Sequence, residues 1–107
     1  MAEIVYRKLV RDRIPEIIVS TGKTCRTSVL TEKEYLDALD SKLDEEIREY
    51  HESRQLEELA DLMEVIYASA EALGFSKEEL EAVREKKKAA RGGFSERIFL
   101  ESVSDNQ

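Results

Sequence analysis

Apolar side chains recur at spacings of three and four along the middle of the chain, which is the period of an amphipathic helix. Thr31 is followed three residues later by Glu34, the pattern of a capping box that opens a helix. The pattern predicts a helix over about 32–52. Its apolar stripe consists of Leu36, Leu39, Leu43, Ile47 and Tyr50.

Two further helices follow. The first is predicted over about 55–73 and ends at Gly74, a residue suited to a helix C-terminus. Its apolar side consists of Leu56, Leu59, Leu62, Met63, Ile66, Ala70 and Leu73. A third helix is predicted over about 77–91, before Gly92 and Gly93. The polar break at 52–55 is short, so the two long helices are expected to form an antiparallel hairpin.

The two ends of the chain are less regular. Asp12 is expected to cap a short helix that holds Pro15 in its first turn and ends at Gly22. Residues 24–30 and 97–100 have the composition of extended segments, so two short strands could pair there. The tail over about 102–107 is polar and is expected to be frayed.

These elements predict an all-α protein, an antiparallel hairpin or bundle of three to four helices with two possible short terminal strands. A length of 107 residues favours a single domain over 1–107. A chain of this size buries a modest core, so a core shared between copies suits it well.

Charge and composition exclude several classes of protein. The chain has 24 acidic and 17 basic residues, with a net charge of −7, which argues against a nucleic-acid polymer as partner. No apolar run approaches the ~20 residues of a membrane span, and no secretory h-region follows Met1. The single cysteine, Cys25, fits a reducing compartment, so a cytoplasmic location is expected.

Some of the acidic residues do not fit a solvated helix face. At about 100° per residue, three glutamates of the second long helix form an outer edge: Glu57, Glu64 and Glu71. Glu58 and Asp61 instead share a flank with small and apolar residues, which a neighbouring helix is expected to cover. On the preceding helix, Glu46 and Glu49 point to the edge of the packing seam, whereas Glu45 lies furthest from the apolar stripe.

Four carboxylates are therefore expected to converge near the connected end of the hairpin, and an oxygen-only cluster is typical of a magnesium site. The predicted metal ligands are Glu46, Glu49, Glu58 and Asp61. The alternative is a set of surface ion pairs with lysines of the third predicted helix. A di-iron carboxylate bundle requires Glu-x-x-His pairs, and the only histidine, His51, forms none.

Basic residues at both ends of the chain are candidates to bind the phosphates of a substrate. Lys87 and Arg91 continue the inward positions of the third predicted helix; the alternative is that they stabilise its C-terminus and reach water. Lys8 and Arg11 are the best candidates in the basic N-terminal segment. Ion pairing with the acidic helices is the alternative for both of them.

The motif Glu45-Glu46-x-x-Glu49, followed by Glu58-x-x-Asp61, resembles the signature of the all-α nucleoside triphosphate pyrophosphohydrolases. That superfamily includes the MazG proteins. The layout of about 5–100 is similar to a small MazG-like branch described as phosphoribosyl-ATP pyrophosphohydrolase-like. Its members open with a segment resembling 8–15 and close with one resembling Arg91-Gly92-Gly93-Phe94.

The resemblance implies a magnesium-dependent hydrolase, with manganese as an alternative ion, that cuts a nucleoside triphosphate between its α and β phosphates. The products would be a nucleoside monophosphate and pyrophosphate, a house-cleaning activity. The same four carboxylates would bind the metal, and Glu45 would support them or act as a base that orients water. A homodimer or homotetramer is also implied.

Two other functions remain open on the residues alone. The acidic helices could form a non-catalytic interaction module for a basic partner, or the fold could bind nucleotide without turnover. A specific metal site should raise the thermal midpoint saturably with magnesium, which an interaction module should not do.

Overall fold

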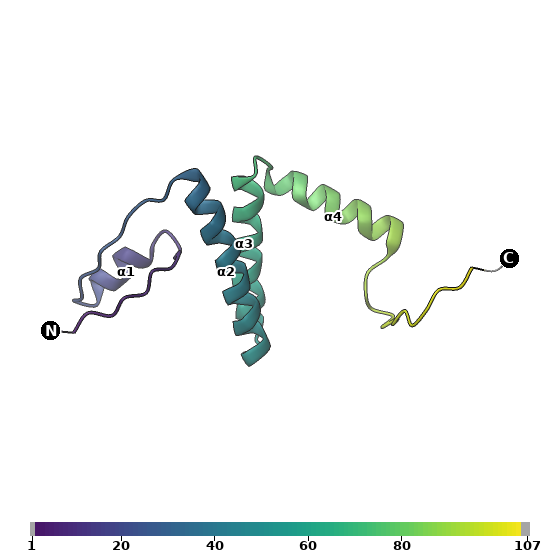
Figure 1. The fold of residues 1–107 in the computed structure, drawn as a ribbon, viewed down its shortest axis with the longest axis horizontal. Helices are drawn as coiled ribbons and strands as arrows, with labels where there is room; N and C mark the ends of the chain where they lie inside the picture. The colour runs from purple at the N-terminus through teal and green to yellow at the C-terminus, as the bar shows by residue number, and fades with distance from the viewer. Residues whose placement is uncertain (1, 106–107) are drawn as a thin grey trace.

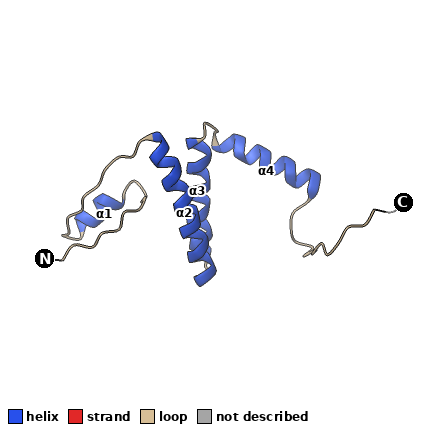
Figure 2. Cartoon of the chain, viewed as in Figure 1, coloured by secondary structure: helices blue, strands red, loops and turns tan. Residues whose placement is uncertain are grey.

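The chain folds as an all-α protein. A computed structural model describes residues 2–105, and in this range it holds four helices and no strand (Figure 2). The helices are α1 (Ile14–Ser20), α2 (Glu32–Ser53), α3 (Leu56–Ala72) and α4 (Lys77–Arg91). The bounds of the three long helices lie within a residue of those predicted from the sequence pattern. None of the four helices is long and apolar enough to cross a membrane.

The helices α2 and α3 form the predicted antiparallel hairpin and lie side by side (Figure 1). The capping box at the start of α2 is complete: the Glu34 amide donates to the Thr31 hydroxyl, and the Thr31 amide donates to the Glu34 carboxylate. At its other end, Arg54 adopts a left-handed conformation with φ of 57°. This residue ends α2 and reverses the chain into α3.

The hairpin seam contains the small core of the molecule. Leu39 of α2 and Val65 of α3 are its buried apolar side chains among the described residues, at 2% and 8% exposure. The flank of α3 that carries Glu58 and Asp61 faces this seam, as expected from its small and apolar neighbours. The broader apolar stripe of α3 is only partly covered within the described residues, and the side chains at least 39% exposed include Leu59, Met63 and Ile66.

The helix α4 leaves the far end of the hairpin at a wide angle (Figure 1). Gly74, with φ of 94°, ends α3: its amide donates to the Glu71 carbonyl, and the Phe75 amide donates to the Ala70 carbonyl. This is the Schellman arrangement, which needs a left-handed residue. Beyond the turn, the Tyr67 hydroxyl donates to Glu81 at 3.1 Å, which ties the first half of α4 to α3.

Two expectations for the chain ends are wrong. Asp12 does not cap α1, because the helix begins later and its N-cap is Arg13, which makes no side-chain cap. Residues 24–30 and 97–100 form no strands within the described part of the chain. They lie near opposite ends of the molecule (Figure 1), so neither can satisfy the backbone groups of the other.

The molecule is elongated. Its principal extents are 72 × 31 × 22 Å and its radius of gyration is 19.1 Å, whereas a compact domain of this length has a radius of about 13 Å. The terminal segments and α4 extend to either side of the hairpin (Figure 1). The hairpin alone therefore provides a rigid framework for clustered side chains.

Candidate metal site

Three of the four predicted ligands meet near the closed end of the hairpin. Glu46 comes from the second half of α2, and Glu58 and Asp61 come from the first two turns of α3. Each offers a carboxylate oxygen, and the three oxygens lie within 4.8 Å of one another. The spacing of three residues places Glu58 and Asp61 on one helix face, and the antiparallel packing brings Glu46 opposite them.

Glu46 is the most unusual member of the group. Its side chain is 7% exposed, and its Oε2 atom has no hydrogen-bond partner. Burial raises the pKa of this carboxyl, and the nearby charges of Glu49 and Asp61 add to the rise, while Lys42 opposes it. A buried carboxylate with an unpaired oxygen is costly, so the site is suited to a cation.

Glu49, the fourth predicted ligand, is not one of the three residues whose oxygens meet. It is half-buried on α2 and close enough for its charge to raise the pKa of Glu46. Its role as a ligand stays a prediction.

The basic N-terminal segment reaches the acidic residues. The guanidinium of Arg11 donates to Oδ1 of Asp61 at 2.6 Å, and the ammonium of Lys8 donates to Oε1 of Glu45 at 3.2 Å. Both phosphate candidates thus make the ion pairs that were the alternative role for them. Both pairs are partly exposed, so an anionic ligand could still reach the two cations.

Lys42 is a basic residue of this cluster that the sequence pattern did not single out. Its Nζ lies 2.9 Å from Oε2 of Glu45 and 3.4 Å from Oε1 of Glu46. The signal for it was its position three and four residues before these glutamates, where helical side chains meet. Lys42 and then Lys8 lower the pKa of the Glu45 carboxyl, although burial works in the opposite direction. A depressed pKa weakens Glu45 as a base and favours a supporting role.

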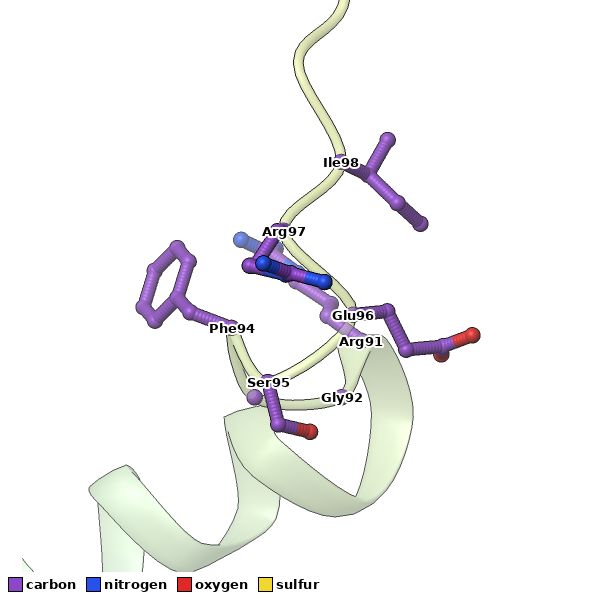
Figure 3. A pocket seen from close by; sticks show the side chains of 8 residues that line it. Arg91, Gly92, Phe94, Ser95, Glu96, Arg97 and Ile98 are labelled. Carbon is purple, nitrogen blue, oxygen red and sulfur yellow. The ribbon is translucent and has the colours of Figure 1, made fainter.

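Lys87 and Arg91 lie away from this cluster within one chain. Roughly 16 Å of α3 separates Asp61 from Ala72, and α4 then runs outward from that far end (Figure 1). Arg91 instead borders an open hollow of about 310 Å³ formed by residues 91–98 (Figure 3). Within residues 2–105, no acidic helix forms an ion pair with Lys87 or Arg91. Their contact with phosphate stays a prediction.

The donor set fits a hard divalent cation. Glu46, Glu58 and Asp61 offer only oxygen atoms, which Mg²⁺ and Mn²⁺ prefer over softer ligands. The orphaned Oε2 of Glu46 is the observation that separates this group from an ordinary acidic surface, where water satisfies each carboxylate. Three protein carboxylates that give one oxygen each leave coordination positions for water and for a phosphate.

Comparison with known proteins adds a partial relative. The chain is similar to an uncharacterized protein of Mycolicibacterium smegmatis (strain ATCC 700084 / mc(2)155), with 55% identity over 42 residues. The match covers 39% of this chain and 43% of the relative, so it spans less than half the length of the curated relative. No family model matches the chain, and no solved structure matches it. The function is therefore argued from the residues of the site.

Proposed function

We propose that the protein is a metal-dependent nucleotide pyrophosphohydrolase that cleaves the α–β phosphoanhydride of a nucleoside triphosphate. The observation that carries this proposal is the buried carboxylate of Glu46, which has an unpaired Oε2 and offers one oxygen to a group with oxygens of Glu58 and Asp61. The spacing of these acids, which resembles that of the all-α pyrophosphohydrolases, supports it.

Each group of site residues would have a distinct role in this reaction. Glu46, Glu58 and Asp61 would hold the ion, with Glu49 as the fourth ligand. A bound Mg²⁺ would lower the pKa of a water molecule and neutralise phosphate oxygens as charge develops on them. Lys8 and Arg11 would turn from their carboxylate partners to the phosphate chain, and Glu45 would hold Lys42 in place.

We further infer that the working form is a homo-oligomer, a dimer or tetramer. The chain exposes 10174 Å², whereas a compact monomer of its mass exposes about 6,100 Å². A second copy packed on the exposed stripe of α3 would cover much of this excess. It would also allow Lys87 and Arg91 of one copy to approach the acidic cluster of another.

The test is an assay of purified protein with a panel of nucleoside triphosphates that includes oxidised and deaminated bases. Pyrophosphate and monophosphate should appear in equal amounts, and only with Mg²⁺ or Mn²⁺ present. Glu46→Gln and Asp61→Asn should lower turnover by about 100-fold or more, because each removes charge from the ion's ligands. The exposed Glu57→Gln on α3 is the matched control and should retain full activity.

The competing function, a non-catalytic acidic interaction module, predicts a thermal midpoint that does not depend on Mg²⁺. A specific site should raise the thermal midpoint with a saturable dependence on Mg²⁺, and Asp61→Asn should abolish that rise. A midpoint indifferent to Mg²⁺, together with no turnover of any nucleotide in the panel, would reject the pyrophosphohydrolase. A saturable rise without turnover would show a metal site that lacks this activity, and a further rise on adding a nucleoside triphosphate would identify a nucleotide-binding relic.

A further inference from the structure

Lys42 occupies a position where a lysine is unexpected. It lies on the same face of α2 as Leu39, three residues before it, and Glu46, four residues after it, and both of these are buried. Its own side chain is 16% exposed. A lysine on a helix surface usually carries its ammonium into water, whereas this one ends between the carboxylates of Glu45 and Glu46.

The two carboxylate oxygens of Glu46 lie in different environments. Oε1 lies 3.4 Å from Nζ of Lys42, and Oε2 is buried without a partner. A carboxylate held on one oxygen has a restricted rotation, so the direction of the second oxygen is fixed as well. The same ammonium lies 2.9 Å from Oε2 of Glu45, and Glu45 is not among the three residues whose oxygens converge.

The other cation at this cluster is placed differently. Arg11 pairs with Asp61 through side chains that are 54% and 40% exposed, so water or a ligand can replace it. Lys42 is covered, comes from the same helix as its partners, and has lost most of its contact with water. An ammonium this well covered would lose the interactions that offset its partial desolvation if it left both carboxylates.

We propose that Lys42 is a positioning residue for the metal site: it holds Oε1 of Glu46, so that Oε2 is presented to the divalent cation, and it keeps Glu45 out of the ligand set. This role rests on the proposed metal site. It differs from simple charge neutralisation, which predicts the opposite effect of removing the lysine. A lysine that only opposes the cation would, when lost, leave the site more negative and the ion more tightly bound.

The experiment measures Mn²⁺ binding to the full chain by electron paramagnetic resonance of the free ion, with calorimetry as a second reading. Lys42→Met should weaken binding by about 10-fold or more, the usual effect of removing a group that orients a metal ligand. Lys42→Arg, which keeps the charge and the donors, should recover most of the affinity. Lys33→Met, an exposed lysine near the start of α2, is the matched control and should bind as the wild type does.

A double-mutant comparison separates positioning from a general structural effect. In the Glu46→Gln background, Lys42→Met should cause no further loss, because the lysine acts through that carboxylate. A loss of the same size in both backgrounds would overturn the proposal. Circular dichroism verifies folding of each variant. If Lys42→Met does not fold, Lys42→Ala, which removes both the charge and the donors and suits a helix, carries the same expectation.

The outcomes distinguish this role from the function on which it rests. A wild-type chain that binds no Mn²⁺ rejects the metal site and this role with it. A wild type that binds Mn²⁺, with Lys42→Met binding as tightly or more tightly, rejects the role of Lys42 and leaves the metal site intact.

Discussion

At the residue scale, Glu46 links the stability of the chain to its chemistry. The carboxyl has a raised pKa because it is buried and faces Glu49 and Asp61. The folded state therefore holds this proton more tightly than the unfolded chain does. The contribution of protonated Glu46 to the stability of the fold is complete below the ordinary pKa of 4.5. It is lost as the pH rises through the folded-state pKa. At neutral pH without metal, the ionised carboxylate of Glu46 therefore destabilises the folded state.

Glu46→Gln should therefore stabilise the metal-free protein at pH 7. The thermal midpoint in the presence of a chelator should rise by a few degrees, since each kcal/mol is worth roughly 4–8 °C in a domain near this size. The gain should disappear near pH 4, where Glu46 is protonated in both states. Glu57→Gln should leave the midpoint unchanged at either pH. A loss of stability in Glu46→Gln at pH 7 would show that its pairing with Lys42 outweighs the cost of burial.

The candidate ligands could be predicted from the sequence only in part. The helical period placed Glu58 and Asp61 on a covered flank and Glu46 at the seam, because a period of 3.6 fixes which residues share a face. It could not reveal that Glu46 would be buried with one oxygen unpaired, since that depends on how closely α2 and α3 approach. It also did not single out Lys42, because a lysine beside two glutamates on an acidic helix resembles ordinary surface pairing.

At the element scale, the ends of the three long helices were the most predictable feature. Thr31 with Glu34 and Ser76 with Glu79 form the two capping boxes, and Gly74 ends α3, because these motifs satisfy backbone groups locally. The prediction of strands at 24–30 and 97–100 was wrong because strand formation is not decided by local sequence. A strand needs a partner distant in sequence, and composition carries no information about whether that partner is within reach.

The cap of α2 should contribute to stability without affecting the metal site. Thr31→Ala should lower the free energy of unfolding by about 1 kcal/mol, since it removes the acceptor for the Glu34 amide. Thr31→Ser, which retains a hydroxyl, should recover most of this loss. The affinity for Mn²⁺ should stay within twofold of the wild type, because roughly 20 Å of helix separates Thr31 from Glu46. A large fall in Mn²⁺ affinity would mean that the whole of α2 shifts when its first turn frays.

At the scale of the whole molecule, the sequence predicted apolar faces but not which of them one chain would cover. The apolar stripe of α3 was read as one side of a bundle. The structure packs the neighbouring flank, with Val65, against α2 and leaves Met63 49% exposed. A helix with two apolar faces needs two partners, and a single hairpin supplies one.

Met63→Glu should therefore disrupt self-association. The wild type should elute, with light-scattering detection, at a multiple of the 12.3 kDa chain mass. The variant should shift toward the monomer, with association weakened by about 100-fold, because a buried charge replaces an apolar contact. Glu64→Gln, the adjacent residue on the outer edge, should keep the wild-type mass. A wild type that is monomeric at all concentrations would reject the oligomer.

The exposed stripe of α3 has a consequence for how the protein responds to dilution. Where folding and assembly share one apolar surface, the law of mass action ties them together: separated copies are less stable than assembled ones. The unfolding temperature should then rise with protein concentration, as it does for obligate assemblies. Dilution would therefore lower the stability of the folded chain. The concentration of the protein in the cell would help to set its folded fraction.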